Sequence, residues 1–250
     1  YFSVVYQPQI HVADGRLRGF EALLRWQHPA VGEVPPALFI PLLEETRLIN
    51  RLGSWIFDQG AEQRQAWSHI FAPDMVLSVC VSPTQFCLPN LASELKRAMD
   101  RFELKPGQIE VEITETALVN NLTHSHKQLK LLHEVGVRIA LDDFGTGECS
   151  LSHLRNLQLD TLKLDRRFVA NIAGSKREAA MASSIIDLSR NLDMLVIAEG
   201  VETAEQYQWL ADNGCQVMQG FLIAHPMLPE DALRFPGHFD VAGFRQTRLL

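Results

Sequence analysis

The stretch HKQLKLLHEVGVRIALDDFGTG, residues 126–147, shows the unit from which the fold is built. A helix candidate, His126–Val135, leads through a glycine into an apolar strand, and the strand ends in two adjacent carboxylates, Asp142 and Asp143. Short apolar strands and longer amphipathic stretches alternate in this way along most of the chain, and strands joined by helical crossovers form a parallel sheet. About eight strands in 250 residues favour a closed (β/α)8 barrel, an α/β fold, over a doubly wound sheet.

The start of the chain departs from this alternation. Two strand candidates, FSVVYQP (residues 2–8) and LRGFEALLRW (residues 17–26), have no helix between them, and the turn sequence ADGR, residues 13–16, is typical of a hairpin. We therefore predict a modified, TIM-like (β/α)8 barrel with an antiparallel first strand. The chain shows no internal repeat or linker, so residues 1–250 are expected to form a single domain, and its abrupt start in a strand suggests a domain excised from a longer protein.

Composition excludes several classes of function. The chain is 46% hydrophobic, enough for one large core, and a net charge of −7 without a basic run argues against a nucleic-acid polymer as partner. No apolar stretch approaches the roughly 20 residues of a membrane span, and no signal peptide is visible. The cysteines form no C-x-x-C pair and are expected to be reduced in a cytoplasmic domain, without a zinc site or disulfide framework. They are Cys80, Cys87, Cys149 and Cys215.

Two adjacent acids at a strand end allow two simple interpretations. Asp is common where a strand turns into a loop, because its side chain caps turns and helix starts. The segment GTGECS, residues 145–150, is also one residue short of a dinucleotide-binding G-x-G-x-x-G motif. A pyrophosphate there would lie beside Asp142 and Asp143, and the negative charges would repel each other. A phosphate near this loop therefore requires a cation beside it.

Polar side chains also follow the other strand candidates, at the point where each strand ends. In a barrel these ends converge on one mouth, where barrel active sites lie. Oxygen ligands without a His–Cys set favour Mg²⁺ or Mn²⁺ over zinc. The sequence therefore predicts a magnesium or manganese site at the barrel mouth. The residues in question are Glu21, Arg25, Glu112, Glu115, Asp142, Asp143, Lys163, Asp165, Glu199, Glu202 and Gln219.

An ordered set of short motifs resembles the EAL domain family, which hydrolyses the bacterial second messenger cyclic di-GMP. The naming motif Glu21-Ala22-Leu23 is followed by Leu-Arg-Trp, and the match extends from YQP, residues 6–8, to Pro226. The further motifs are EITE (112–115), DDFGTG (142–147), LKLD (162–165), AEGVE (198–202) and QGF (219–221). The family fold is a modified (β/α)8 barrel with an antiparallel first strand, in agreement with the hairpin. A member of this family is expected within a multidomain signalling protein, whose other domains can include a membrane anchor.

The resemblance implies a site for two divalent cations, Mg²⁺ or Mn²⁺. Glu21, Glu112 and Asp142 would hold the first cation. Asp142 would bridge to the second, which Asp143 also holds and Glu199 assists. Two such cations generate hydroxide near neutral pH and neutralise the charge that builds on a phosphodiester during attack.

The resemblance also implies residues for substrate binding and catalysis. Lys163 would position or deprotonate the attacking water, because a lysine beside cations loses its proton more easily than one in water. Glu115 would anchor the DDFGTG loop, Arg25 would contact a substrate phosphate, and Gln219 would orient the water network. For Glu202 the alternative role is a cap on the helix that follows. The expected substrate contacts are Arg25, Gln7, Gln219 and Glu202.

Three segments depart from the family pattern. Where the family supplies an Asn as a metal ligand, VLSVCVSP places Cys80, whose thiol is a soft ligand that must lose a proton to bind well. The alternative is that Cys80 is a small buried filler. The family's Tyr-Ser-Ser after DDFGTG is here Glu148-Cys149-Ser150, in the loop after Asp143 through which a homodimer is expected to form. IAHP, residues 223–226, replaces a more polar stretch at the expected substrate rim.

Three functions are compatible with these residues. The first is a metal-dependent phosphodiesterase that opens cyclic di-GMP to linear pGpG, at a rate that Cys80 can reduce. The second is a degenerate EAL domain that binds cyclic di-GMP without cutting it and signals to the other domains of its protein. The third, an unrelated Mg²⁺-dependent barrel enzyme such as an enolase-like lyase, leaves the ordered motifs unexplained. The intact acids and Lys163 favour the enzyme, and Cys80 favours the receptor.

Overall fold

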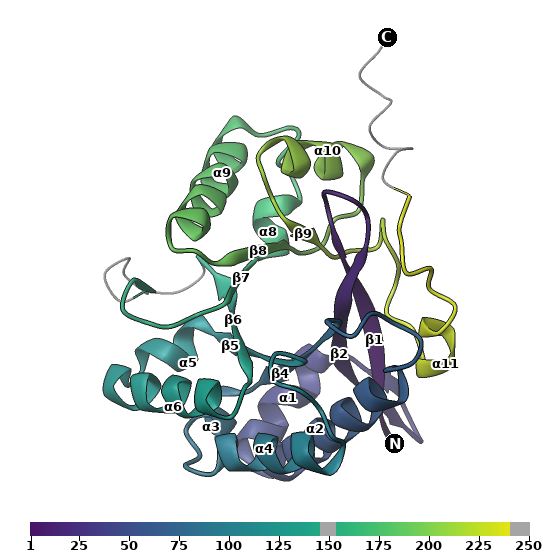
Figure 1. Ribbon diagram of the computed structural model, residues 1–250, viewed down its shortest axis with the longest axis vertical. Helices are drawn as coiled ribbons and strands as arrows, with labels where there is room; N and C mark the ends of the chain where they lie inside the picture. The colour runs from purple at the N-terminus through teal and green to yellow at the C-terminus, as the bar shows by residue number, and fades with distance from the viewer. Residues whose placement is uncertain (146–153, 241–250) are drawn as a thin grey trace.

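Eight strands close into a barrel, and helices surround it (Figure 1). The structure is a computed structural model that describes residues 1–145 and 154–240. The barrel strands are β1 (Phe2–His11), β2 (Leu17–His28), β4 (Val76–Val81), β5 (Ile109–Thr114), β6 (Arg138–Phe144), β7 (Thr161–Leu164), β8 (Leu195–Ala198) and β9 (Val217–Met218). Their order is β1-β9-β8-β7-β6-β5-β4-β2, and the pairing of β1 with β2 closes the circle. Neighbours are parallel except at β1, which is antiparallel to both β2 and β9, so the predicted fold class is confirmed.

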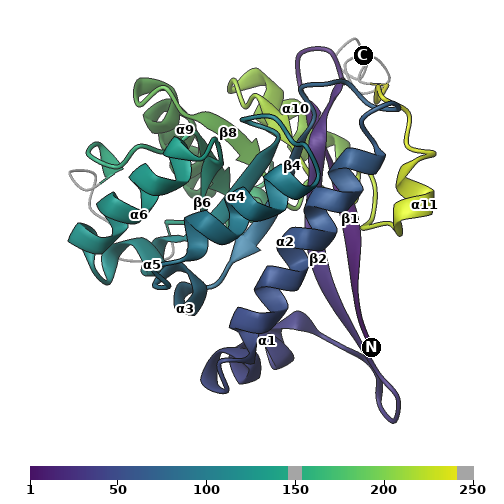
Figure 2. The same cartoon turned by 60° about the horizontal axis from the view of Figure 1, so that its bottom comes forward.

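The β1–β2 hairpin is longer than the barrel needs. Its strands have 10 and 12 residues, and β2 pairs with β4 only from Gly19 to Ala22. The remaining half of β2 projects from the barrel, where β3 (Gly32–Val34) extends the sheet and helix α1 (Pro36–Glu45) lies beside it (Figure 2). The predicted turn contains Gly15 at φ 73°, a conformation that favours glycine. The projecting half of β2 carries Arg25 beyond the barrel wall.

The helix predicted over His126–Val135 is confirmed as part of α6 (Leu122–Glu134), which begins four residues earlier, and further helices surround the barrel. The described helices are α1 (Pro36–Glu45), α2 (Leu48–Ala66), α3 (Pro83–Phe86), α4 (Leu91–Arg101), α5 (Glu115–Val119), α6 (Leu122–Glu134), α8 (Arg166–Val169), α9 (Lys176–Asn191), α10 (Ala204–Asp212) and α11 (Pro229–Ala232). The sequence did not indicate α3, α5, α8, α11 or the short strand β3, because elements of three to five residues are too short to show a period. The strand that pairs with both β1 and β8, β9, has only two residues.

Helix α10 settles one open alternative for Glu202. The N-cap of α10 is Thr203, whose side chain accepts a hydrogen bond from the Gln206 backbone N–H. The Gln206 side chain in turn accepts one from the Thr203 backbone N–H. This capping box provides hydrogen-bond partners for backbone N–H groups at the start of α10. The carboxylate of Glu202, which is exposed, is not needed for this. The cap interpretation of Glu202 is therefore wrong. The helix is followed by Gly214 at φ 80°, the glycine expected at its C-terminal end.

Two β-bulges change which side chains face the barrel interior. Between β1 and β2 the pairing passes from Gln9–Gly19 to Ile10–Leu17, so Arg18 is an extra residue on β2. Between β6 and β7 the register shifts after Leu141, and Asp143 there has the left-handed φ of 56°. A bulge breaks the strict alternation of side chains and re-aims the bulged residue. Both bulges lie next to the polar residues that form the site.

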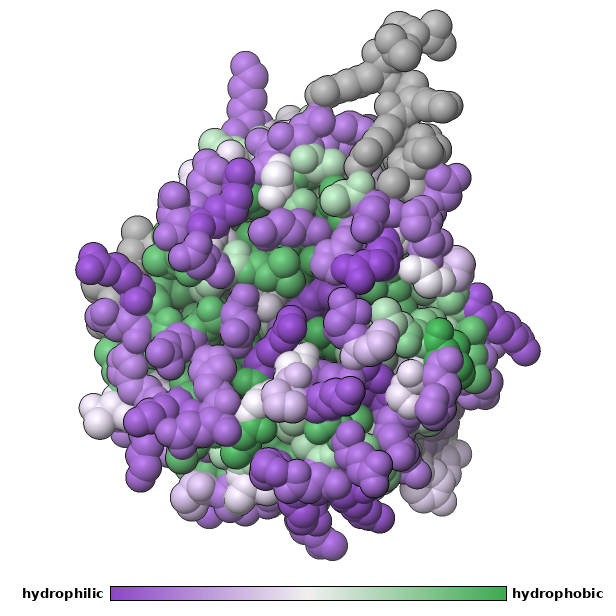
Figure 3. Space-filling view, in the orientation of Figure 1, coloured by the Kyte–Doolittle hydropathy of each residue, from purple (hydrophilic) through white to green (hydrophobic). Residues whose placement is uncertain are grey.

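The outer surface is mixed in character. On the face drawn in Figure 3, hydrophobic side chains form separate patches between hydrophilic ones. Among the helices of residues 1–145 and 154–240, none combines the length and apolar character needed to cross a membrane.

Candidate active site at the barrel mouth

Strand register places the predicted acids on the same side of the barrel wall. Cys80 on β4 pairs with Glu112 on β5, and Thr114 on β5 pairs with Asp142 on β6. Because side chains alternate along a strand, residues two apart share a face. Lys163 on β7 pairs with Ile197 on β8, so Glu199, two residues further on, faces the same interior. The expected convergence of strand ends therefore occurs at this mouth.

Lys163 lies at the centre of these acids. Its side chain is 1% exposed, and its Nζ lies 2.7 Å from Glu199 Oε1 and 3.6 Å from both Glu21 Oε1 and Asp142 Oδ1. It also makes a short ion pair with Glu112. Lys163 is therefore a buried residue of the barrel interior and not a surface lysine. We call these five residues, Lys163 with Glu21, Glu112, Asp142 and Glu199, the carboxylate cluster.

The carboxylate cluster holds more negative charge than its lysine balances. Burial alone would lower the pKa of Lys163, but the carboxylates around it raise that pKa well above its usual range, so the lysine is an ammonium. Burial and then the charge of Glu21 raise the pKa of Glu112 well above its usual range. Burial first, and then the neighbouring acids Asp142 and Glu21 against the opposing Lys163, raise the pKa of Glu199 to about 8. Divalent cations would relieve this repulsion.

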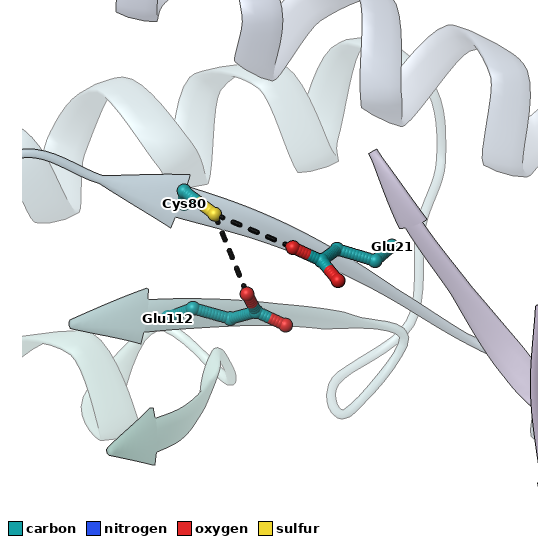
Figure 4. A group of neighbouring side chains, drawn as sticks. All are labelled: Glu21, Cys80 and Glu112. Carbon is teal, nitrogen blue, oxygen red and sulfur yellow. Dashed lines mark hydrogen bonds between the residues drawn. The ribbon is translucent and has the colours of Figure 1, made fainter. Parts of the chain in front are cut away.

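Cys80 faces the carboxylate cluster from the neighbouring strand. Its Sγ lies 3.6 Å from Glu21 Oε1 and 3.4 Å from Glu112 Oε2, and Figure 4 shows both carboxylates pointing toward the thiol. One ligand atom from each of the three residues lies within 4.8 Å of the others. The Cys80 side chain is exposed at the mouth, so the alternative of a buried filler is wrong. The protein atoms packed around it and then the nearby carboxylates raise the pKa of the thiol well above its usual range.

The second acid of the DDFGTG motif lies apart from Lys163. The Asp143 backbone N–H donates to Asp142 Oδ1 at 2.9 Å, and the Asp143 carboxyl shares a hydrogen bond with Asp165. Burial, then the charge of Asp142, and then Asp165 raise the pKa of Asp143 to about 6. The structure thus brings Asp142 into the carboxylate cluster and turns Asp143 toward Asp165.

Glu115 contacts the loop that follows these acids. Its side chain is 2% exposed, and its Oε2 accepts a hydrogen bond from the Gly145 backbone N–H at 3.1 Å. Gly145 has φ 90°, and a Cβ there would come within 2.8 Å of the Phe168 ring, so glycine is required. The expected dimer loop, including Glu148-Cys149-Ser150, lies outside the described residues.

Two glutamines, Gln7 on β1 and Gln219 directly after β9, are hydrogen-bonded next to Glu21. The Gln219 Nε2 group donates to Glu21 Oε2 and, at 3.0 Å, to Gln7 Oε1. Gln7 in turn donates to the carbonyl of Ala224 at 3.1 Å, so the IAHP segment is tied to the site by its backbone. Gln7 and Gln219 are both buried. Gln219 therefore links Glu21 to Gln7 through the two hydrogens of its amide.

Two pockets flank the carboxylate cluster. One, of about 280 Å³, is mainly apolar and has Arg25, Cys80 and Asp142 in its wall. The other, of about 270 Å³, is lined mainly by polar residues, among them Glu21, Glu199, Glu202 and Gln219. Arg25 lies 3.9 Å from Glu33 and donates to the Leu24 carbonyl at 2.9 Å. Arg25 and Glu202 thus lie on opposite sides of the cluster.

The motifs, the antiparallel first strand and the convergence of acids all match one family. The family model of the EAL domain matches residues 1–226. The chain belongs to the EAL domain family. Among curated relatives, the bifunctional diguanylate cyclase/cyclic di-GMP phosphodiesterase MucR of Pseudomonas aeruginosa is 38% identical over 228 residues, which are 91% of this chain and 33% of that protein. The cyclic di-GMP phosphodiesterase PA2567 of the same species is 37% identical over 229 residues, 92% of this chain and 39% of that protein.

A solved structure supports the same assignment. The MucR phosphodiesterase in complex with c-di-GMP superposes on this EAL domain with a TM-score of 0.89 at 37% identity, covering 92% of this chain and 94% of that chain. The EAL domain described here spans roughly a third of the length of the two curated relatives. The family and the fold are therefore shown for this chain.

Sequence reasoning missed a second polar group inside this EAL domain. Beneath the carboxylate cluster lie an ion pair, Arg18 with Glu110, and the side chains of Gln9, Ser78 and Thr161 that contact it. One signal was available, since Glu110 stands two residues before Glu112 in EVEITE and so shares its face of the strand. Arg18 gave no such signal, because its inward position depends on the bulge.

Proposed function

We propose that this EAL domain is a phosphodiesterase that depends on divalent cations and opens cyclic di-GMP to linear pGpG. The observation that carries the proposal is the carboxylate cluster, in which four carboxylates face one buried ammonium. The names of MucR and PA2567 support it, as does the c-di-GMP in the MucR structure. An acidic cluster of this kind repels a phosphodiester unless cations are present.

The residues present fit such cations. Glu112 Oε1 is buried and has no hydrogen-bond partner among the described residues, as expected of an oxygen that binds a metal ion. Glu21, Glu112 and Asp142 would hold one cation, and Asp142, Asp143 and Glu199 a second. When bound, Mg²⁺ or Mn²⁺ supplies hydroxide near neutral pH and neutralises the charge on the reacting phosphate.

The remaining residues would bind and orient the substrate. The two flanking pockets suggest that a cyclic dinucleotide lies across the carboxylate cluster with one base on each side. Arg25 would contact a phosphate from the apolar side, and Glu202 would contact the substrate from the polar side. Lys163, as an ammonium, would hold the attacking water by a hydrogen bond and stabilise the negative charge that forms beside it. Gln219 and Gln7 would orient the attacking water indirectly, because their hydrogen bonds hold Glu21 in place.

Cys80 favours a second candidate, a domain that binds cyclic di-GMP without cutting it. A neutral thiol is a poor ligand for Mg²⁺, and the nearby carboxylates oppose its ionisation. In that case the domain would act as a receptor that signals to the other domains of its protein. The distinction lies in turnover and not in binding.

One experiment tests both candidates together. We expect the domain to bind cyclic di-GMP more tightly with Mg²⁺, Mn²⁺ or Ca²⁺ than with a chelator, because cations neutralise the acids that face a dianion. Calorimetry measures this binding, and chromatography of the incubated nucleotide detects pGpG. Binding with pGpG supports the phosphodiesterase, and binding without pGpG in any metal supports the receptor. Absence of binding in all three metals would refute both.

The substitution Cys80→Asn tests whether the cysteine on β4, which stands where the family has an asparagine, weakens the cation site. Asparagine offers a hard, neutral oxygen at nearly the same volume, so we expect metal affinity to rise by roughly 10-fold or more, a typical scale for changes around a metal site. Turnover should rise with it. We expect the wild type to be more active with Mn²⁺ than with Mg²⁺, because Mn²⁺ accepts softer ligands, and the variant should reduce this difference. Calorimetry with each metal and pGpG formation measure these effects.

A matched control for this substitution is Cys87→Asn, which changes another exposed cysteine outside the site. Because Cys80 is itself exposed, its replacement should lower the melting temperature little. A Cys80→Asn protein that melts early and binds metal no better would show that the first cation site does not use β4.

We make three proposals about the wider protein, which concern its other domains, its oligomeric state and its location. We infer that this domain is joined to other signalling domains, since it spans roughly a third of MucR and PA2567. A homodimer through the loop after Asp143 and a cytoplasmic site of action agree with the family resemblance. Light scattering of the isolated domain tests the dimer.

A further inference from the structure

Arg18 and Glu110 form an ion pair inside the barrel that none of the proposed catalytic steps uses. Arg18 is 4% exposed and Glu110 is fully buried, and their Nη2 and Oε2 atoms are 2.6 Å apart. Barrel interiors are usually filled by layers of branched apolar side chains. A buried ion pair is often no more stabilising than apolar residues of the same volume. Stability alone therefore does not explain this pair.

Glu110 holds the guanidinium of Arg18 in one orientation. Its Oε1 accepts a hydrogen bond from Ser78 Oγ at 2.8 Å, and its Oε2 accepts one from Thr161 Oγ1 at 2.8 Å. With both carboxylate oxygens occupied and Arg18 placed inward by the bulge, the guanidinium has a fixed direction.

The fixed guanidinium determines the orientation of two amides above it. Arg18 Nη1 donates to Gln9 Oε1 at 2.5 Å, and a guanidinium has no acceptor, so the Gln9 amide must present its oxygen to Arg18. The Gln9 Nε2 group then donates to Gln219 Oε1 at 2.9 Å. The Gln219 Nε2 group is thereby left to donate to Glu21 Oε2. We call the side chains of Gln9 and Gln219 the amide relay.

The amide relay ends on a residue of the carboxylate cluster. With Glu21 Oε2 held by Gln219, the other oxygen, Oε1, faces Lys163 and Cys80 at 3.6 Å from each. If Gln219 were reversed, its oxygen would face the oxygens of Glu21 and Gln7, which are both acceptors. Only one orientation of the two amides is therefore compatible with Arg18 below and Glu21 above.

We propose that Arg18 is a positioning residue, which acts through the amide relay to hold Glu21 Oε1 toward the cation site. This inference rests on the proposed function, because it assigns Glu21 to a cation. Outer partners that orient a metal ligand change metal affinity by about 10–100-fold when they are removed. Through the amide relay, Arg18 in the layer beneath the carboxylate cluster would act as such an outer partner of Glu21.

Three variants of the 250-residue chain test the relay through Mn²⁺ affinity, measured by calorimetry. Gln9→Met breaks the relay without changing charge. Arg18→Met/Glu110→Met removes the orienting guanidinium together with its counterion, so no buried charge is left unpaired. The third variant combines all three substitutions. We expect each variant to bind Mn²⁺ roughly 10-fold more weakly than the wild type. The combined variant should bind Mn²⁺ no more weakly than the other two, because all the changes interrupt the same chain of hydrogen bonds.

A second measurement reports on the relay in the absence of metal. In the wild type, both protons of the Gln219 side-chain amide are hydrogen-bonded in a buried site, so NMR should show slow exchange with solvent. The exchange should be faster in Gln9→Met and in Arg18→Met/Glu110→Met. A matched control is Arg64→Met, which removes another buried arginine; Arg64 lies on helix α2 and donates to the Met75 and Pro73 carbonyls, not to the amide relay. This variant should lower the melting temperature while Mn²⁺ affinity and Gln219 exchange stay unchanged.

The outcomes separate this inference from the proposed function. Wild-type protein that binds Mn²⁺ while the relay variants bind it equally well would overturn the relay and leave the proposed function intact. Losses that add up in the combined variant would also overturn it, since they would show two independent effects. Wild-type protein that does not bind Mn²⁺ would overturn the proposed function, and the role of the relay with it.

Discussion

Asp142→Asn is expected to abolish pGpG formation, with a loss on the order of 10³-fold or more. In the proposed site Asp142 would help to hold both cations, and their charge stabilisation would be worth several kcal/mol. Asp142 Oδ1 lies 3.6 Å from Lys163 Nζ and also accepts the Asp143 backbone N–H, so one substitution disturbs the centre of the site. The same substitution removes a negative charge from a crowded cluster. Without metal, the variant should therefore melt at the same temperature as the wild type or higher.

Thermal melts with and without Mn²⁺ provide the second measurement for Asp142→Asn. A ligand at 100 times its dissociation constant stabilises the folded state by about 2.7 kcal/mol, which is a readily measured shift. The wild type should show this shift and the variant should lose most of it. A suitable control is Asp187→Asn, an exposed carboxylate paired with Arg190 on α9. Turnover that survives Asp142→Asn would show that the proposed metal arrangement is wrong.

Lys163→Met is expected to lower kcat by roughly 10²–10⁴-fold, the range for loss of a group that acts at the attacking water, with a smaller change in KM. The fold should respond as well. Removing the ammonium leaves the surrounding carboxylates without their internal counterion, so the variant should be less stable than the wild type in a chelator. Mn²⁺ should restore its stability, because cations replace the missing positive charge, but it should not restore turnover.

Steady-state kinetics on cyclic di-GMP and melts in Mn²⁺ or chelator measure the effects of Lys163→Met. The control is Lys96→Met, which removes an exposed lysine that pairs with Asp100 on α4. A Lys163→Met protein that is rescued in stability by Mn²⁺ and retains kcat within a few-fold would contradict a role for Lys163 at the water.

Local patterns in the sequence were sufficient for the fold and for most members of the site. The alternation of strand and helix and the ADGR turn predicted the barrel and its antiparallel first strand. The acids at the strand ends, including Glu112 and Asp142, were found because a parallel barrel brings those ends together. Side-chain alternation has a fixed period of two, so Lys163 and Glu112 could be expected on the interior face without coordinates.

The tertiary structure decided the features that depend on distant strands. The bulges that place Arg18 inside the barrel and turn Asp143 toward Asp165 arise from register shifts between paired strands, and the local sequence does not specify them. The exposure of Cys80 and the raised pKa of Glu199 likewise depend on neighbours that come from other parts of the chain. The sequence by itself determined which chemical groups reach the barrel mouth, since that follows from strand period and strand ends. Only the tertiary structure decided how those groups are oriented and charged, because burial, hydrogen bonding and Coulomb forces act between residues that the closed barrel brings together.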